Sequence, residues 1–306
     1  AKPTALVPEA MAGADLRAGG RFVFVGLRAT KNFYPAYLAD NLGQVKLPSG
    51  ARLEARAVEL SDPGDEADLS PLDYARRFED PRFRDDVVAE LRPRLQPGES
   101  VGLPAVLGLD AHRAVLQALR DRLERPVFEV PTLPPSVPGI RLFRALRERL
   151  RAVGVRIVLG PSVFGAETGD GAVSAVLVRG AANRSTAHTA RSFVLATGGF
   201  ATGAIHVDSF GEVREAVFGL PVAGVPASDA PRYLPGYFDD HPLARAGLAV
   251  DGRLRPVDAD GRAMFDNLVA VGAALGGAEP WREQSGNGLA LATGFAAASQ
   301  IVEGAT

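Results

Sequence analysis

The sequence predicts an α/β protein, and three observations carry this prediction. Short apolar runs alternate with amphipathic stretches from residue 21 to residue 130, which is the pattern of an open α/β layer. A proline-rich segment at 131–139 then interrupts the alternation. Beyond it, two short apolar strands are expected at 192–196 and 268–271, and each is followed closely by glycine.

The composition describes a globular protein with a substantial core. With 306 residues the chain is long enough for one large or two ordinary domains, and 46% of its residues are hydrophobic. The formal net charge of -2 gives no electrostatic reason to expect nucleic acid or an anionic membrane surface as a partner. No apolar run approaches the roughly 18 residues that a membrane span requires. Because the sequence has no cysteine, any electron carrier must be an organic cofactor or lie on another subunit.

The first layer is expected to alternate strands with helices. Its strands are expected at 21–26, 53–60, 100–107 and 126–130. Its helices are expected at 32–42 with Asn32 as cap and Pro35 in the first turn, from Ser70-Pro71 onward, at about 83–95, and after Asp110 as cap, with Val115, Leu119 and Leu123 on one face. Residues 61–69 are acidic and are interpreted as a solvated loop without a function.

The second part begins with the connector 131–139, which its prolines are expected to hold extended, with no helical option. A helix should follow, with Phe143, Leu146, Leu150 and Val153 facing the core. Further strands are expected at 155–159, 162–167, 172–179 and 188–191, with a hairpin turn at Gly169-Asp170-Gly171. Residues 201–262 are expected to be irregular apart from a hairpin at Asp251-Gly252, and 289–301 should be a helix buried on most sides.

Glycines cluster around the last strand and the last helix. Gly272 ends the strand, Gly276-Gly277 lie in the following loop, and Ser285-Gly286-Asn287-Gly288 opens the helix. Unpaired N–H groups point outward where a helix begins, and they favour an anion or an electron-rich ring edge. The strand–glycine–loop–glycine–helix pattern therefore predicts a ligand site; the alternative is a closely packed helix whose small residues admit another element.

Several of these segments together resemble a known family. The helix, the three-stranded meander, the turn Ala196-Thr197-Gly198-Gly199-Phe200 and the final glycine-rich helix start are similar to flavoproteins of the fumarate reductase and succinate dehydrogenase type. The string Pro131–Leu142, together with 217–220, 247–256 and 267–277, resembles the B-subunit family of anaerobic glycerol-3-phosphate dehydrogenases. The likeness runs from about residue 22 to residue 303. The resemblance implies an FAD-binding, Rossmann-like flavoprotein fold with an inserted α/β domain at 1–130 and the C-terminal part of the flavin-binding domain at 131–306.

The resemblance also implies a cofactor and its contacts. In this family the turn at Thr197, Gly198 and Gly199 passes close to the dinucleotide portion of a flavin, and Ser285, Gly286, Asn287 and Gly288 face its ring, with Gly272, Gly276 and Gly277 nearby. The flavin is FAD or FMN. The family opens with a strand, a Gly-x-Gly-x-x-Gly turn and a helix that hold the phosphates, and that pattern does not occur in these 306 residues. The fold is therefore expected to be N-terminally incomplete, and the flavin to be absent from this chain on its own.

The implied function is that of a flavin-dependent subunit of a quinone-linked anaerobic glycerol-3-phosphate dehydrogenase, active only within a complex and oxidising glycerol 3-phosphate to dihydroxyacetone phosphate. The alternatives are a non-catalytic electron-relay or scaffolding subunit, or a generic fumarate-reductase-like oxidoreductase. The expected partners are a catalytic flavoprotein, an iron–sulfur protein of the same complex and a small-molecule substrate, not nucleic acid. The expected location is cytoplasmic, at the inner face of the cell membrane through a partner subunit.

Two residues are weak catalytic candidates. Arg141 could be the cation that binds an anionic substrate, or a structural ion-pair residue. His241 could be an acid–base group, or simply a histidine in an exposed turn. Asp239-Asp240-His241 resembles part of a metal site, but no second ligand cluster supports one, so no metal is expected. His112 and His188 are expected to be structural.

Overall fold

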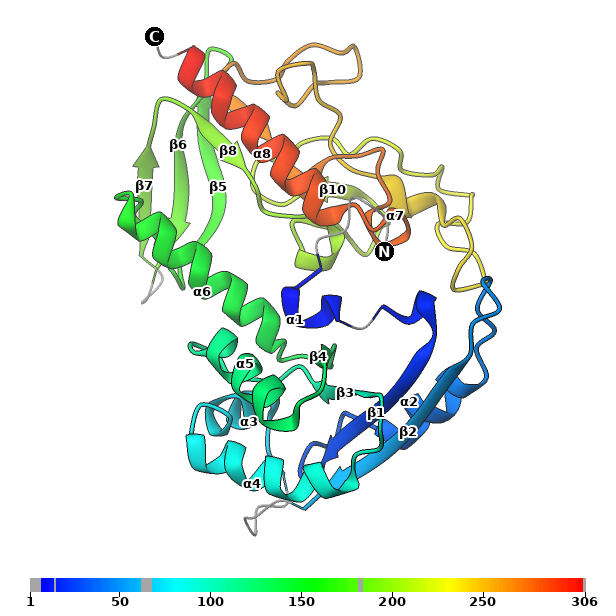
Figure 1. Ribbon diagram of the computed structural model, residues 1–306. Coiled ribbons are helices and arrows are strands. Elements are labelled where there is room, and N and C mark those ends of the chain that lie inside the picture. Colours follow the sequence, from blue (N-terminus) through cyan, green and yellow to red (C-terminus); the bar gives the residue numbers. More distant parts are fainter. Residues whose placement is uncertain (1–6, 14, 62–67, 181–183, 305–306) are drawn as a thin grey trace. The chain divides into compact units, whose positions relative to one another are not determined.

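The computed structural model describes residues 7–13, 15–61, 68–180 and 184–304 (Figure 1). The described chain folds into two compact units, 7–157 and 158–304. The strand expected at 21–26 and the strand expected at 192–196 belong to different sheets. Each unit has its own core, so the two are described separately.

The unit 7–157 is built on a four-stranded sheet. Its strands are β1 (Gly20–Leu27), β2 (Leu53–Leu60), β3 (Glu99–Pro104) and β4 (Val127–Val130). They lie in the order β2-β1-β3-β4, and every neighbouring pair is parallel. A parallel sheet covered on both faces needs strands that are apolar throughout. This requirement explains why residues 22–27 are buried without interruption, and the strands expected in this layer are confirmed.

Helices cover both faces of this sheet (Figure 1). One core joins alternate residues of β1 to three helices, and a second core joins the other residues of β1 to α2. The three helices are α3 (Pro71–Arg77), α4 (Pro81–Leu91) and α5 (His112–Leu123), whereas α2 is Pro35–Gly43. The short helices α1 (Glu9–Ala12), η1 (Leu16–Ala18) and η2 (Arg92–Arg94) complete the unit. The unit is therefore a three-layer α/β/α arrangement.

The starts of these helices confirm one expected cap and correct two. Ser70 caps α3 in a reciprocal capping box with Asp73, as its sequence predicts. Asn32 is not a cap, because α2 begins only at Pro35 without a side-chain cap. Asp110 does not cap α5 either. Glu79, from the turn before α4, accepts the N–H groups of residues 109–111 at 2.9, 2.6 and 3.0 Å. Helix α5 itself has no side-chain cap, and no local pattern could reveal that a residue so far away along the chain holds the loop before it.

Helix α6 (Val137–Ala152) departs from its prediction in two ways. It begins at Ser136, whose hydroxyl accepts the N–H of Gly139, so the end of the proline-rich string is helical rather than extended. Proline is tolerated in a first helical turn, which is why the string can end this way. The apolar residues expected to face the core are instead 43–65% exposed: Phe143, Leu146, Leu150 and Val153.

The packing of α6 also determines where the boundary between the two compact units lies. Val137, in the first turn, is fully buried in a small core with Leu109 and Ala75. This contact attaches α6 to the first unit, so the compact units divide at 157/158 and not at 130/131, where the change in composition lies. The strand expected at 155–159 does not form, because Val155 donates its N–H to the carbonyl of Leu150 and closes the end of the helix at 3.0 Å.

The unit 158–304 contains a meander and a pair of parallel strands. The meander is antiparallel and consists of β5 (Ser162–Gly169), β6 (Ala172–Arg179) and β7 (Ser185–Thr189). Asp170 and Gly171 have φ values of 50° and 74°, which confirms the hairpin turn. The parallel pair is β8 (Phe193–Leu195) with β11 (Leu268–Ala270). One core joins the meander to this pair through Val173, Leu195 and Leu268.

The segment between the two parallel strands contains more regular structure than expected. Residues 201–262, expected to be irregular, contain the antiparallel pair β9 (Ile205–Val207) and β10 (Val213–Glu215). Short helices are η4 (Phe200–Thr202), η5 (Pro242–Arg245), η6 (Gly272–Ala274) and α7 (Pro280–Glu283), and the long C-terminal helix is α8 (Gly286–Glu303).

The expected burial of helix α8 on most sides is wrong. Leu291 and Phe295 are 62% and 76% exposed, and α8 packs through Ala297 against Val269 and Val271.

The helices of the described segments differ from membrane-spanning helices in length or in apolar character. None of them combines the length and the apolar character that crossing a membrane demands.

Candidate functional site

The parallel pair β8–β11 brings two glycine turns to one edge of its sheet. Phe193 lies opposite Leu268, and Leu195 lies opposite Ala270. Because the strands are parallel, the turn after β8 and the turn after β11 leave the sheet at the same carboxyl edge. In open α/β sheets, ligands bind outside the carboxyl ends of the strands. We use the name carboxyl-edge site for residues 197–199, 272–274 and 285–288.

The turn after β8 is held closely against the turn after β11. A Cβ atom at Gly199 would lie 2.6 Å from the carbonyl oxygen of Ala273, so only glycine allows this approach. Gly198 has a φ of 90°, and a Cβ atom there would lie 2.5 Å from the hydroxyl oxygen of Thr202. That hydroxyl lies 2.9 Å from the carbonyl oxygens of both Thr197 and Gly199 and fixes the turn. Sequence reasoning missed Thr202, because nothing local distinguishes it.

The turn after β11 is in turn fixed to α8. Gly272, with a φ of 68°, donates its N–H to the hydroxyl of Thr293 at 2.9 Å. Thr293 donates its own hydroxyl proton to the carbonyl of Leu289 at 2.7 Å. The hydroxyl thus joins a buried backbone group to the helix, and Thr293 is a further residue that the sequence did not point out.

The start of α8 offers unpaired backbone donors. Leu289 is the first residue of the helix whose N–H bonds back along the chain, to the carbonyl of Ser285 at 2.8 Å. Within the described residues, no acceptor contacts the N–H groups of Gly286, Asn287 and Gly288. Ser285 does not cap them, because its hydroxyl donates to Glu283 at 2.9 Å. These three donors and the positive end of the helix dipole face solvent, which is the arrangement that an anion or a carbonyl edge requires.

The two glycines between β11 and α7 have different roles. Gly276 lies against Gly247, where a Cβ atom would come within 2.4 Å of the Gly276 nitrogen, so this pair serves backbone packing. Gly277 has a φ of 90° and donates its N–H to the carbonyl of Arg245 at 2.8 Å, and the space where its Cβ would lie is open. Gly277 is therefore the one of the two that could admit a ligand.

A buried carboxylate anchors the loop that precedes α8. The side chain of Glu279 is fully buried, 3.5 Å from the Nε atom of Arg245 and 3.2 Å from that of Arg282. Arg282 also donates to the carbonyl of Phe238 at 2.8 Å. The cluster joins residues 238–245 to α7 and so holds the start of α8 in place. It was not identified from sequence, because its members are far apart along the chain.

Arg141 lies in the other unit and is fully engaged there. Its guanidinium donates two hydrogen bonds to the fully buried carboxylate of Glu129, at 2.7 and 2.9 Å, and a third to the carbonyl of Gly108 at 2.7 Å. Glu129 also accepts the N–H of Leu107 at 2.8 Å. This geometry is that of the structural ion pair that the sequence left open, and it favours that role over substrate binding.

His241 is also held by structural contacts. Its Nδ1 atom accepts the N–H of Leu234 at 3.1 Å, so the neutral ring donates from Nε2 to the carbonyl of Tyr237, also at 3.1 Å. Asp239 accepts the N–H of Gly236 at 2.9 Å. Within the described ranges, no group of three or more histidine or acidic side chains is arranged to hold a metal ion. His112 and His188 contact Leu107 and Thr186, respectively.

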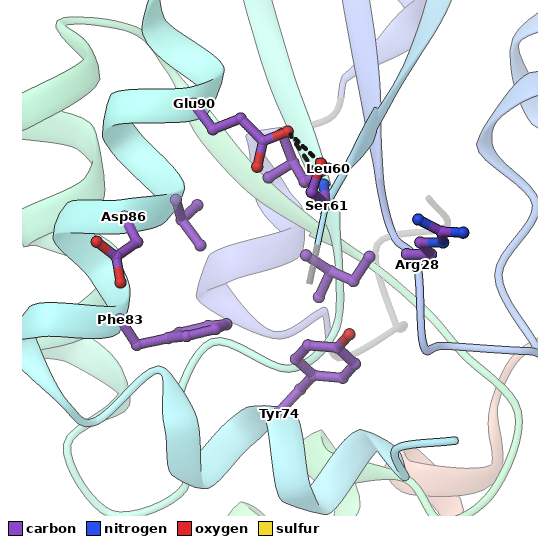
Figure 2. Close-up of a pocket in the computed structure, with 9 residues that line it drawn as sticks. Arg28, Leu60, Ser61, Tyr74, Phe83, Asp86 and Glu90 are labelled. Atoms are coloured by element: carbon purple, nitrogen blue, oxygen red, sulfur yellow. Dashed lines mark hydrogen bonds between the residues drawn. The ribbon is translucent and has the colours of Figure 1, made fainter. Parts of the chain in front are cut away.

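A cavity of about 100 Å³ lies in the unit 7–157, at the carboxyl ends of β1 and β2 (Figure 2). Three of its polar residues, Ser61, Glu90 and Tyr74, take part in hydrogen bonds. Figure 2 shows the hydrogen bonds from Ser61 to Glu90, whose distances are 3.0 Å from the N–H and 3.2 Å from the hydroxyl. The hydroxyl of Tyr74 accepts the N–H of Ala29 at 3.3 Å. The remaining lining consists of four apolar residues together with Arg28 and Asp86.

Comparisons with known proteins give the family of the chain. The model of the FAD binding domain family matches residues 2–289. A protein from Halobacterium salinarum, named as the probable B subunit of anaerobic glycerol-3-phosphate dehydrogenase, is 36% identical, with the alignment covering 99% of this chain and 72% of the relative. The B subunit of anaerobic glycerol-3-phosphate dehydrogenase from Yersinia pseudotuberculosis is 30% identical, over 92% of this chain and 65% of the relative. The corresponding protein from Glaesserella parasuis is 29% identical, over 91% and 66%.

No solved structure matches the chain. The family match covers nearly the whole chain, and these relatives agree in name. These findings confirm both the resemblance and the α/β flavoprotein fold that it implies. The chain belongs to the FAD binding domain family and, within it, to the B subunits of anaerobic glycerol-3-phosphate dehydrogenase.

Proposed function

We propose that this chain is the flavin-dependent subunit of an anaerobic glycerol-3-phosphate dehydrogenase and that it holds FAD at the carboxyl-edge site. One observation carries the proposal. Two glycine turns, at 197–199 and 272–274, meet at one edge of a parallel strand pair, beside the unpaired N–H groups of residues 286–288. Ligands of open α/β sheets bind at this edge, and in this chain of the FAD binding domain family the unpaired backbone donors lie beside it.

The residues present fit a flavin in chemical terms. The N–H groups of Gly286, Asn287 and Gly288 would donate to the electron-rich carbonyl edge of the ring, and the helix dipole would favour negative charge there. Thr197 and Gly277 border open space and would bound the rest of the cofactor. Bound flavin supplies hydride and electron transfer, whereas the protein supplies binding and orientation.

The names of the relatives support glycerol 3-phosphate as the proposed substrate. Its product would be dihydroxyacetone phosphate, and we propose a quinone as the final electron acceptor. The chain has no cysteine to ligate an iron–sulfur cluster, so electrons would leave through a second subunit that carries clusters, beside a larger catalytic flavoprotein. Through these partners the chain would lie at the cytoplasmic face of the cell membrane.

A second candidate function is that of an electron relay without a substrate site of its own. The structural contacts of the two candidate catalytic residues favour this function. Arg141 is bound to Glu129, and His241 is bound to two backbone groups. A hydride-transfer site needs a free cation or acid–base group near the cofactor.

Flavin binding is the first quantity to measure. FAD would be added in excess to the purified chain, since the opening phosphate-binding pattern is absent from this sequence, and binding would be followed by quenching of flavin fluorescence. Gly288→Leu should weaken binding strongly. Gly294→Leu, on the same helix with open space at its Cβ position, should not. Equal binding by both variants would contradict the proposed site.

Anaerobic addition of glycerol 3-phosphate then separates the two candidate functions. If the chain is catalytic, the flavin absorbance bleaches with substrate alone. If the chain is a relay, it retains the oxidised spectrum until the partner flavoprotein is added. If the flavin absorbance falls equally in a sample whose flavin is not bound to the chain, that result would argue against both candidate functions.

A further inference from the structure

Four exposed aromatic side chains gather at α7, in the unit 158–304. They are Tyr233, Tyr237, Phe238 and Trp281, which are 63%, 77%, 79% and 46% exposed, respectively. Soluble proteins seldom leave a contiguous group of large aromatic side chains open to water, and such a group commonly marks an interaction surface. We call these four residues the aromatic cluster.

The rings form one group because they contact one another. The centroid of the Tyr237 ring lies 4.9 Å from that of Phe238 and 6.2 Å from that of Trp281, so this part of the chain is joined to α7. The ring of Tyr233 lies 5.8 Å from that of His241. Both ring nitrogens of His241 contact the backbone of the segment that carries the two tyrosines, so Tyr233 belongs to the group as well.

Structural contacts hold the cluster in place. Arg282 donates a hydrogen bond to the carbonyl of Phe238 at 2.8 Å, and its guanidinium carbon lies 5.4 Å from the centroid of the Trp281 ring. The buried carboxylate of Glu279 lies 3.2 Å from Arg282 and fixes that side chain in turn. Because these contacts limit the positions of the rings, the cluster loses less conformational freedom on binding than mobile side chains would.

The charges around the cluster are predominantly acidic. Residues 229–245 and 279–283 carry five acidic and three basic side chains. All three arginines already contact acceptors within this unit, whereas the side chain of Asp240 is 65% exposed. An acidic rim repels an anionic membrane and a second copy of the same surface. It attracts a partner protein that carries basic residues around an apolar centre.

The cluster adjoins the carboxyl-edge site. Two residues separate α7 from α8, and Figure 1 shows α7 beside the start of α8. The Cβ atom of Pro280 lies 3.5 Å from the position that a Cβ atom at Gly286 would take. Ser285 donates its N–H to the carbonyl of Pro280 at 3.1 Å. Trp281 is therefore next to the helix start at which the flavin ring is proposed to bind.

We propose that the aromatic cluster is the docking surface for the iron–sulfur subunit that receives electrons from this chain. The inference rests on the proposed function, because it takes the flavin to lie at the neighbouring carboxyl-edge site. Electron transfer between proteins slows steeply as the distance between the carriers increases, so the acceptor should dock beside the start of α8. Tryptophan, tyrosine and arginine are also the residues that most often dominate the binding energy of a protein interface. The partner surface should carry an apolar centre that covers the rings and basic residues that face Asp229 and Asp240.

The single tryptophan of the chain gives a direct test. Because Trp281 is that tryptophan, incorporation of 5-fluorotryptophan produces one fluorine NMR signal that reports on the cluster alone. The probe is the purified iron–sulfur subunit of the dehydrogenase from the same source, added to the whole chain without flavin. Binding of this subunit should move the signal. It should also reduce the response of the signal to replacement of H2O by D2O, because the indole ring becomes buried.

Variants then identify the side chains that bind. Tyr237→Ala and Phe238→Ala should each weaken binding of the iron–sulfur subunit about tenfold or more in calorimetry, as residues at the centre of an interface do. Tyr37→Ala is the matched control, because it removes a tyrosine of the other unit that is similarly exposed. Asp240→Lys should also weaken binding, and this loss should shrink as salt is added.

The proposal is overturned if the iron–sulfur subunit does not bind, if it binds without moving the Trp281 signal, or if Tyr37→Ala weakens binding as much as the cluster variants do. A signal that moves instead with the concentration of the chain alone, or with phosphatidylglycerol vesicles, would also overturn it, in favour of self-association or of a membrane surface. Flavin binding is measured separately by fluorescence quenching. Docking through the cluster by a chain that binds no FAD would contradict the proposed function and leave the docking surface standing, whereas FAD binding without docking would do the reverse.

Discussion

The ion pair between Arg141 and Glu129 gives the sharpest test of a structural role against a catalytic one. In Arg141→Met, the carboxylate of Glu129 stays fully buried and keeps only the N–H of Leu107 as a donor, while the carbonyl of Gly108 also loses its partner. Removing one member of a buried ion pair costs about 3–5 kcal/mol. The free energy of unfolding of a domain is only about 5–15 kcal/mol, so the loss should be large.

Helix α6 supplies a matched control. Arg144 lies one turn further along and pairs with Asp110 at 2.6 Å, but the two side chains are 44% and 71% exposed. An exposed pair contributes about 0–1 kcal/mol, so Arg144→Met should have little effect. Replacing both buried partners, in Glu129→Met with Arg141→Met, should recover much of the stability because no uncompensated charge remains.

Urea unfolding followed by far-UV circular dichroism measures these differences. The reasoning is refuted if Arg141→Met is no less stable than Arg144→Met, or if the double variant is less stable than the single one. If Arg141 were instead a substrate-binding cation, Arg141→Met would abolish turnover and leave the free energy of unfolding unchanged.

Three further predictions concern single residues. Burial alone would raise the pKa of Glu79, but three backbone N–H bonds outweigh it and lower the pKa below its ordinary value. The carboxylate therefore stabilises the fold above its unfolded pKa, and this stabilisation is lost as the pH falls through the folded pKa. Glu79→Gln should lower the free energy of unfolding by about 1–3 kcal/mol near neutral pH. The variant should also lose less stability on acidification than the parent chain does. Gly199→Ala should destabilise by about 1–3 kcal/mol, because its Cβ would meet a backbone carbonyl at 2.6 Å, and equal thermal stability to Gly165→Ala, where the space is open, would contradict this. Thr293→Val should cost about 1–3 kcal/mol in urea unfolding by leaving the N–H of Gly272 unpaired, and Thr293→Ser should restore most of it; two equally stable variants would speak against this bond.

Features set by neighbouring residues could be predicted from the sequence. The strand at 20–27 follows from its uninterrupted apolar run, the start of α3 from Ser70 and Pro71, and the hairpin from Asp170-Gly171. The glycine turn at 197–199 and the helix start at 285–288 could also be found, because steric limits on φ and the unpaired groups of a helix start are local properties.

Only the tertiary structure decided which distant residues meet. The sequence showed that α6 and α8 have apolar faces, but their apolar side chains, including Phe143 and Phe295, are largely exposed, because an amphipathic pattern does not specify what covers it. The contact of Glu79 with the loop before α5, the bond from Gly272 to Thr293 and the pairing of Arg141 with Glu129 all join segments that are not adjacent in the chain. Such contacts depend on how the elements pack in space, and no local pattern of a single sequence encodes that packing.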